Sequence, residues 1–282
     1  MSGLGAKNPA VQHLRRLSRR RSARSDSGSF VVDGPVLVAE ALDAGLRLEA
    51  VYVEQGDDGR VPADLHAVAD RAERRGATRH ELFAGVLAGA VDTVTPHGIA
   101  AVASMPPARA DLDGLLAATA PDLAGGGAGP VLVLAGVGDP GNAGTLLRSA
   151  EAAGARAVVA TVGSVDLYAP KVVRASAGSL FRVPVVVGAE VDDLLLALAG
   201  AGVATIGTAA DAPAPYDATD LAGPIAVVLG TEAHGLDPAL AAQLDSSVSI
   251  PMEGQVESLN VAMAGTLLLF EAARQRRLGR PG

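Results

Sequence analysis

The chain has 282 residues, of which 49% are apolar, 19% are charged and 2% are aromatic, so it can bury a core but offers few rings for stacking nucleic-acid bases. Its formal net charge is −8, yet residues 1–24 contain six Arg and one Lys and no acidic side chain, which indicates either a polyanion contact or a merely solvated helix. The absence of Cys excludes disulfides, thiolate nucleophiles, Cys-based zinc sites and base methylation through a cysteine adduct.

The first third of the chain predicts a small α/β domain. Its expected elements, in chain order, are a basic helix at 8–21, a strand at 30–33, a helix at 36–44, a strand at 49–54, a helix at 63–75 and a strand at 99–104. The sequence HELFA at His80 begins like a zinc-protease helix, but no second His follows. A stretch rich in Pro and Gly then predicts a linker. We therefore expect a basic segment (1–24), a small domain (25–106), a linker (107–129) and a larger domain (130–282).

The larger domain predicts a parallel sheet. Its apolar runs do not alternate with polar residues, which is typical of strands covered on both faces. The runs are VLVLA from Val131, AVVAT from Ala157, VPVVV from Val183, VATIG from Val203, IAVVLG from Ile225 and VSIP from Val248. A last helix is expected over 259–277. The start of the chain lacks an apolar signal core, and no apolar stretch reaches membrane-spanning length, so we expect a cytoplasmic protein with no membrane partner.

The turn after the first of these strands contains Gly136, Gly138 and Gly141, which fit the G-x-G-x-x-G fingerprint of dinucleotide binding. The fingerprint also needs a carboxylate at the end of the next strand, and the first acid there is Asp166. The sequence DPGN, from Asp139, favours a tight turn over a helix start. A nicotinamide or flavin oxidoreductase is therefore the weaker alternative, which an assay of NAD(H) binding would test.

Three turns that follow strands combine polar side chains. The first holds Asn142 and Arg148, the second holds Glu232, and the third holds Ser258, which is expected to cap the last helix, with Asn260 in its first turn. His234, beside Glu232, is interpreted as a loop residue. Such turns meet at the ligand crevice of an open parallel sheet. Because the five His are scattered and no metal-ligand cluster exists, the residues indicate binding and positioning of two ligands without a metal.

The chain resembles the SpoU (TrmH-like) RNA ribose 2′-O-methyltransferases of the SPOUT class. The motifs that carry the resemblance are NAGTLLRSAEAAGA from Asn142, KVVRASAGSLFRVPV from Lys171, LGTEAHGL from Leu229 and IPMEGQVESLNVAMAGTLLLFE from Ile250. FVVDGPVLVAEAL, from Phe30, is similar to the family's small RNA-binding domain. The resemblance implies a deep trefoil knot in the C-terminal domain, a homodimer formed through that domain, and methyl transfer from S-adenosylmethionine to a ribose 2′-hydroxyl of structured RNA. The additional N-terminal domain favours ribosomal RNA, with transfer RNA as the alternative and a non-catalytic RNA-binding member as another.

The resemblance also assigns roles to residues of this chain. Those expected around the reacting ribose are Arg148, Asn142, Glu232, Ser258 and Asn260. Those expected to hold the cofactor are Thr208, Leu229, Gly230, Ile250, Met252 and Leu259. From the charge distribution we expect phosphate contacts from Arg15, Arg16, Arg19, Arg20 and Arg21.

Overall fold

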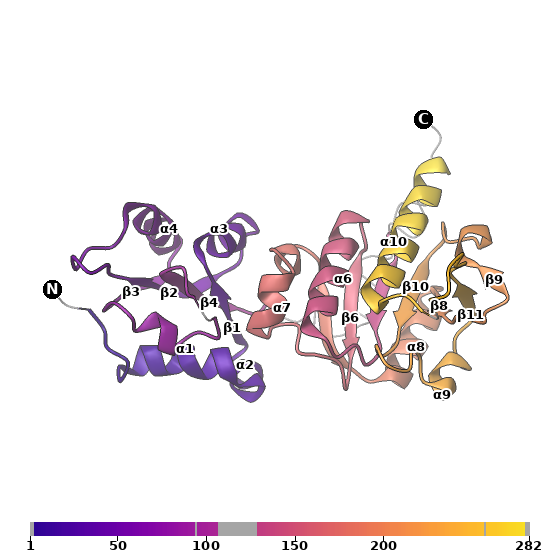
Figure 1. Ribbon diagram of the computed structural model, residues 1–282, viewed down its shortest axis with the longest axis horizontal. Helices are drawn as coiled ribbons and strands as arrows, with labels where there is room; N and C mark the ends of the chain where they lie inside the picture. Colours follow the sequence, from indigo (N-terminus) through magenta and orange to yellow (C-terminus); the bar gives the residue numbers. More distant parts are fainter. Residues whose placement is uncertain (1–2, 94, 107–128, 257, 280–282) are drawn as a thin grey trace. The chain divides into compact units, whose positions relative to one another are not determined.

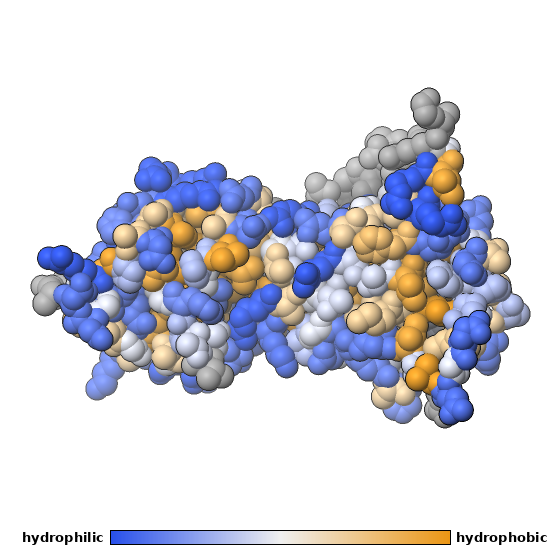
Figure 2. Space-filling view, turned by 45° about the horizontal axis from the view of Figure 1, so that its top comes forward, coloured by the Kyte–Doolittle hydropathy of each residue, from blue (hydrophilic) through white to orange (hydrophobic). Residues whose placement is uncertain are grey.

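The computed structural model of the protein describes residues 3–93, 95–106, 129–256 and 258–279 (Figure 1). The chain forms two compact units, one of residues 1–106 with 168–181 and one of residues 107–167 with 182–282. The expected linker, 107–129, lies outside the described residues except for Gly129. Hydrophilic residues cover much of the face shown in Figure 2. Among the described residues, no helix combines the length and the apolar character needed to cross a bilayer.

The first unit is built on a four-stranded sheet of order β1-β4-β2-β3, in which β4 runs antiparallel to both neighbours and β3 runs parallel to β2. Its strands are β1 (Ser29–Asp33), β2 (Leu48–Glu54), β3 (Thr78–Leu82) and β4 (Ile99–Ser104). Its helices are α1 (Pro9–Arg19), α2 (Arg21–Ser27), α3 (Pro35–Asp43), α4 (Ala63–Arg74) and α7 (Pro170–Ala175), with short 3₁₀ turns η1 (Leu87–Gly89) and η2 (Ser179–Phe181). The predicted strands and helices of this region are thus present.

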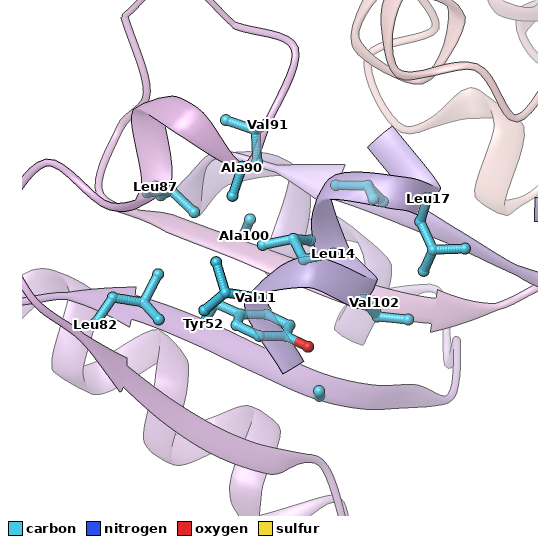
Figure 3. Close-up of a cluster of buried hydrophobic side chains, with 12 residues drawn as sticks. Val11, Leu14, Leu17, Tyr52, Leu82, Leu87, Ala90, Val91, Ala100 and Val102 are labelled. Carbon is cyan, nitrogen blue, oxygen red and sulfur yellow. The ribbon is translucent and has the colours of Figure 1, made fainter. Parts of the chain in front are cut away.

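Helix α1 covers one face of this sheet because its apolar side recurs every three or four residues. Val11, Leu14 and Leu17 are fully buried and meet Tyr52 and Leu82 from the strands (Figure 3). Residues 168–181, which are distant in the sequence, complete another part of the unit. The ring of Phe30 on β1 lies 5.0 Å from that of Tyr168 and 6.2 Å from that of Phe181.

One expectation for local structure was wrong, and a motif that was set aside proves to lie in a strand. His80 belongs to strand β3, whose backbone pairs with β2, and its ring centroid lies 5.0 Å from that of Tyr52. The DPGN sequence is not a tight turn but the start of α6 (Pro140–Ala152). Asp139 is its N-cap and accepts a hydrogen bond from the Asn142 amide (2.8 Å), while Pro140 occupies the first helical position, where its missing N–H costs nothing.

The second unit contains a seven-stranded, fully parallel sheet of order β7-β6-β5-β10-β8-β11-β9. Its strands are β5 (Val131–Leu134), β6 (Ala157–Thr161), β7 (Val185–Ala189), β8 (Ala204–Thr208), β9 (Ala214–Pro215), β10 (Ile225–Leu229) and β11 (Ser246–Ser249). Besides α6, its helical segments are α8 (Val191–Gly200), η3 (Tyr216–Ala218), α9 (Pro238–Ala241) and α10 (Val261–Leu278). The parallel sheet expected from the non-alternating runs is confirmed, and the two-residue strand β9 carried too little pattern to be predicted.

Helices cover both faces of this sheet, with α6 and α10 in front and α8 behind in Figure 1. On one face Leu194 and Leu198 of α8 join the core. On the other, α10 approaches closely because Gly265 has no side chain. A Cβ built at Gly265 would lie 2.5 Å from both Leu146 Cδ2 on α6 and Leu229 Cδ1 on β10. The α6–α10 contact therefore depends on a small residue, and it sets where the N-terminus of each helix lies.

Candidate active site

A cavity of about 440 Å³ opens where strands β8, β10 and β11 end, at the carboxyl edge of the parallel sheet. Three segments form its walls: the residues after β8, the loop after β10, and the chain from β11 into α10. Its lining residues are Thr208, Ala209, Ala210, Asp211, Gly230, Thr231, Glu232, Ala233, His234, Gly235, Leu236, Ala241, Ser247, Val248, Ile250, Met252, Ser258, Leu259, Val261 and Ala264. The volume suits a small organic ligand.

The loop after β10 doubles back tightly on itself. The Thr231 amide donates to the Gly235 carbonyl (2.8 Å), and the Gly235 amide donates to the Thr231 carbonyl (2.9 Å). A Cβ at Gly230 would lie 2.1 Å from the Gly235 carbonyl carbon, so no other residue fits there. This turn holds Glu232 at its tip, between the cavity and the start of α6.

The Glu232 carboxylate is held by three donors at the start of α6. Its Oε1 accepts from the Asp139 amide (2.9 Å) and from Asn142 Nδ2 (3.1 Å), and its Oε2 accepts from the Gly138 amide (3.2 Å). Burial raises the pKa of Glu232, but these hydrogen bonds outweigh burial, so its pKa lies below the ordinary value. Glu232 is therefore ionised at neutral pH, and its carboxylate ties the loop after β10 to the start of α6.

The same contacts explain the glycine motif. A dinucleotide-binding loop uses the free amides at a helix N-terminus to hold pyrophosphate. Here the amides of Gly138 and Asp139 already hold the protein's own carboxylate, Glu232. The dinucleotide hypothesis is therefore wrong, because its anion position is filled from within the chain.

Asn142 joins Glu232 to the last helix. Its Nδ2 donates to Glu232, and its Oδ1 accepts from Asn260 Nδ2 (3.0 Å). Asn260 Oδ1 in turn accepts from the amides of Ala262 (2.9 Å) and Met263 (3.4 Å), so Asn260 is the N-cap of α10. The expectation that Ser258 caps this helix was wrong, because the helix begins only at Val261. Ser258 is instead exposed and lines the cavity.

Most, but not all, of the residues assigned to the cofactor and the ribose line the cavity. The cavity is lined by five of the residues expected to hold the cofactor, Thr208, Gly230, Ile250, Met252 and Leu259. It is also lined by two of those expected around the ribose, Glu232 and Ser258. Leu229 does not line it: the side chain is fully buried under Gly265, on the face of β10 opposite to that of Val228.

Arg148 lies outside the group formed by Glu232, Asn142 and Asn260. It follows Asn142 by six residues on α6, which turns it about 120° away around the helix. Its side chain is exposed and makes no hydrogen bond or ion pair with any described residue. The described chain therefore leaves the Arg148 guanidinium available to a ligand.

The basic N-terminal residues are not equivalent. Arg15 Nε and Arg19 Nη2 donate to the Gly89 carbonyl (2.8 and 3.3 Å), so both also tie α1 to the end of η1. Arg16, Arg20 and Arg21 are exposed, and the side chains of Arg16 and Arg20 make no hydrogen bond or ion pair with a described residue. Within this group, the side chains of Arg16 and Arg20 thus contribute least to holding the fold together.

Two residues that received no functional role from the sequence also line the cavity. Asp211 lines it from the turn after β8, and His234 lines it from the loop after β10. Within the described chain, no three His, Asp or Glu side chains are grouped as metal ligands. Only the tertiary structure brings Asp211 to the cavity, because its surroundings in the sequence, TAADAPAP, carry no recognisable pattern.

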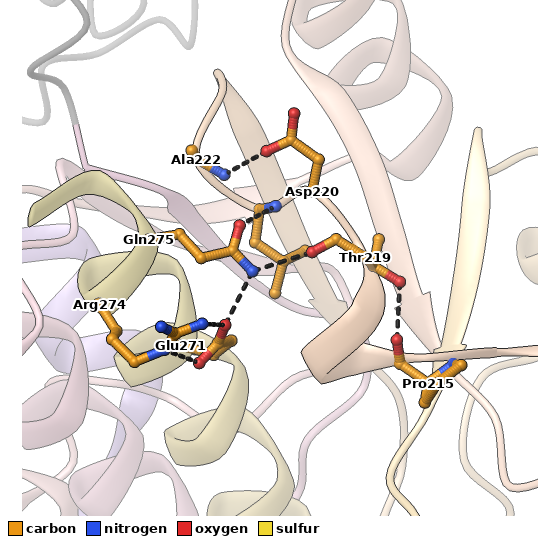
Figure 4. Close-up of polar contacts among 8 residues, drawn as sticks. Pro215, Thr219, Asp220, Ala222, Glu271, Arg274 and Gln275 are labelled. Atoms are coloured by element: carbon orange, nitrogen blue, oxygen red, sulfur yellow. Dashed lines mark hydrogen bonds and ion pairs between the residues drawn. The ribbon is translucent and has the colours of Figure 1, made fainter. Parts of the chain in front are cut away.

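Helix α10 anchors the segment that continues from Asp211 towards β10. Gln275 Nε2 donates to the Thr219 carbonyl (2.9 Å), and its Oε1 accepts from the Leu221 amide (2.8 Å) (Figure 4). Glu271 orients Gln275 through a further hydrogen bond (2.8 Å) and pairs with Arg274 (2.6 Å). Helix α10 thus carries Asn260 at its N-terminus and, near its other end, holds the segment that leads into β10.

Two family models match the chain: the SpoU rRNA Methylase family over residues 129–270, and the MRM3-like substrate binding domain over residues 8–101. The 23S rRNA (guanosine(2553)-2′-O)-methyltransferase RlmP of Bacillus subtilis (strain 168) is 34% identical over 268 residues, which cover 94% of this chain and 96% of that protein.

Solved structures are similar over nearly the whole chain. An AdoMet-bound rRNA methyltransferase from Sinorhizobium meliloti superimposes with a TM-score of 0.81 at 26% identity, covering 97% of each chain. The SpoU methyltransferase AviRb from Streptomyces viridochromogenes, in complex with the cofactor AdoMet, gives a TM-score of 0.77 at 30% identity, covering 96% of this chain and all of that one.

The depressed pKa of Glu232 predicts a pH-dependent contribution to stability. Its ionised carboxylate stabilises the fold above the ordinary carboxyl pKa of about 4.3, and this contribution is lost as pH falls through the lower pKa of the folded state. We expect Glu232→Gln to lower Tm at pH 7 by roughly 2–4 °C, for a loss of about 1 kcal/mol at this exposed position. The difference from wild type should shrink between pH 5 and pH 3.

Thermal unfolding followed by circular dichroism across this pH range measures the effect. The matched control is Glu253→Gln, an exposed carboxylate that makes no hydrogen bond with the described residues. A Tm difference for Glu232→Gln that stays constant from pH 7 to pH 3 would contradict the role assigned to the charge.

Proposed function

The chain belongs to the SpoU rRNA Methylase family, and on that premise we propose which RNA it modifies and which side chains act in the reaction. It is an S-adenosylmethionine-dependent RNA methyltransferase that methylates a ribose 2′-hydroxyl. The observation that carries this function is the cavity at the ends of β8, β10 and β11, which lies within the segment matched by the family model.

The cavity suits the cofactor in size and in the chemistry of its walls. The apolar side chains of Ile250, Met252 and Leu259 form one part of the lining, as an adenine ring requires, and Asp211 and Ser258 are polar. We assign cofactor binding to the backbone at Gly230, Ile250 and Leu259, with Met252 against the adenine and Thr208 as a further contact. When bound, the cofactor supplies a methyl group activated by its sulfonium, so we propose that no metal ion is needed.

Ribose positioning is assigned to the polar side chains around Glu232. The Glu232–Asn142–Asn260 series of hydrogen bonds fixes the first turn of α6 and that of α10 beside the cavity loop. Since Asn142 uses both polar atoms of its side chain within the protein, it orients its neighbours. The Ser258 hydroxyl lines the cavity and makes no hydrogen bond with any described residue, so it is assigned to contact the ribose.

Activation of the 2′-hydroxyl is assigned to Arg148. A hydroxyl attacks a methyl group poorly until its proton leaves, so the site must stabilise the developing oxyanion. A guanidinium, with a pKa above about 12, seldom acts as a base, whereas it stabilises negative charge and binds phosphate well. The exposure of Arg148, and the lack of a side-chain partner for it within the described ranges, support this electrostatic role.

We propose ribosomal RNA as the substrate and the cytoplasm as the place of action. RlmP and the S. meliloti protein are both named for rRNA, and the chain matches each of them over more than nine-tenths of its length. The MRM3-like substrate binding domain model covers α1, which supports an RNA contact there. Arg16 and Arg20 are the assigned phosphate contacts, followed by Arg21, with Arg15 and Arg19 nearby.

We further propose a homodimer formed through the second unit. Met263, Leu267 and Phe270 follow one another along α10 at helical spacing and are 57%, 38% and 44% exposed. Figure 2 shows hydrophobic residues at the surface in the region of this helix. An exposed apolar stripe of this kind is typical of a protein interface. The trefoil knot implied by the family remains a prediction.

A methylation assay tests the function and the choice of RNA. The purified protein should transfer label from S-[methyl-³H]adenosylmethionine to unmodified 23S rRNA, and digestion of the product should yield one 2′-O-methylated nucleoside. Matched reactions with 16S rRNA and bulk transfer RNA should stay at background. Label found only in transfer RNA would overturn the ribosomal assignment, and binding of RNA and cofactor without transfer to any RNA would identify a non-catalytic member.

Arg148→Ala is expected to reduce the rate of methyl transfer by about two orders of magnitude or more, the scale of losing one electrostatic stabiliser. S-Adenosylmethionine affinity, measured by calorimetry, should stay within about twofold, because Arg148 does not line the cavity. Arg148→Lys distinguishes the roles: partial rescue at all pH values indicates a cation, whereas rescue that appears only at high pH indicates a base. A fully active Arg148→Ala enzyme would refute both roles.

Replacing both Arg16 and Arg20 by Gln should weaken RNA binding and reduce its dependence on salt. Each lost phosphate contact lowers the slope of log K against log salt by about one counterion. Filter binding of the full chain to 23S rRNA fragments between 50 and 300 mM KCl measures the slope. Arg274→Gln serves as the control, since Arg274 is paired with Glu271. Equal slopes for the double variant and the wild type would remove the RNA contact from α1.

A further inference from the structure

Asp211 is a carboxylate at the cavity that no other described residue engages. It lies in the turn between β8 and β9, is exposed, and lines the cavity. It makes no hydrogen bond or ion pair with any described residue. A carboxylate that lines a binding cavity and accepts no hydrogen bond from the described residues can offer its oxygen lone pairs to a ligand.

The other charged groups of the cavity do not duplicate it. Glu232 also lines the cavity, but its oxygens already accept three hydrogen bonds from the start of α6. His234 is the remaining ionisable residue of the lining, which includes no Lys and no Arg. The cavity therefore favours a ligand with positive charge, and Asp211 is the group free to meet that charge directly.

The chemistry of the cofactor limits which of its parts meets Asp211. Adenine needs apolar walls, and Ile250, Met252, Leu259 and Val261 supply them. The α-ammonium group of the methionine part keeps its charge only where water or a counter-charge remains, because desolvation of an unpaired ion is costly. Asp211 is exposed at the cavity and offers that counter-charge.

Resting on the proposed function, we propose that Asp211 binds the α-ammonium group of S-adenosylmethionine. A carboxylate can also bind ribose hydroxyls, but a donor that carries charge forms the stronger hydrogen bond with it. Asp211 thereby anchors the methionine part of the cofactor while the adenine is held elsewhere in the cavity. Its contribution applies to every ligand that has the aminoacyl arm and to none that lacks it.

Two nucleosides that differ in the aminoacyl arm test whether Asp211 binds that arm. S-Adenosylhomocysteine has the aminoacyl arm, whereas 5′-methylthioadenosine has the same adenine, ribose and sulfur without it. We expect Asp211→Asn to weaken S-adenosylhomocysteine binding by about threefold to tenfold, the range for a partly exposed ion pair, and to change methylthioadenosine binding by less than about twofold. Isothermal titration calorimetry on the full chain measures both affinities. Raising the salt concentration should reduce the difference in affinity between the two nucleosides only in the wild type.

Asp217→Asn is the matched control, because this substitution removes the same charge at a residue that is exposed in η3 and does not line the cavity. Thermal unfolding without ligand should be unchanged for Asp211→Asn. Equal losses for the two nucleosides would assign Asp211 to the ribose and overturn the proposal, as would no loss for either. A wild-type protein that binds neither nucleoside would instead overturn the proposed cofactor, and with it the proposed function.

Discussion

The hydrogen bonds between the Glu232 carboxylate and the start of α6 organise the site. They connect a loop that follows β10 with a helix that follows β5, about ninety residues earlier in the chain. An anion at a helix N-terminus is stabilised by free amides and by the helix dipole. Because the anion belongs to the protein, the loop, the helix and Asn142 are held together before any ligand arrives.

Close packing extends this arrangement to the last helix. Gly265 lets α10 contact Leu146 of α6 and Leu229 of β10, so the N-termini of the two helices lie near enough for Asn142 and Asn260 to bond. At the far end of α10, Gln275 fixes the segment that follows the wall containing Asp211. Helix α10 therefore lines the cavity with Val261 and Ala264 at one end and holds the segment before β10 at the other.

In the first unit, the arginines of the basic segment divide between holding the fold and facing solvent. Arg15 and Arg19 serve the fold by bonding to the Gly89 carbonyl, whereas Arg16 and Arg20 are left to solvent. The same basic helix thus combines residues that hold it in place with residues available to a polyanion. Its apolar side, buried against Tyr52, keeps the exposed arginines on a rigid surface.

The sequence by itself determined the parallel sheet, since its uninterrupted apolar strands need helices on both faces. It also determined the family, through motifs such as NAGTLLRSAEAAGA and SLNVA, which begin at Asn142 and Ser258. Local pattern failed at the helix starts: a Pro after an N-cap fits a turn as well as a helix, and Ser258 and Asn260 are both good caps. The role of Glu232 as an internal anion, the burial of Leu229 and the arrival of Asp211 at the cavity were decided by tertiary structure, because each depends on segments that are distant in the chain.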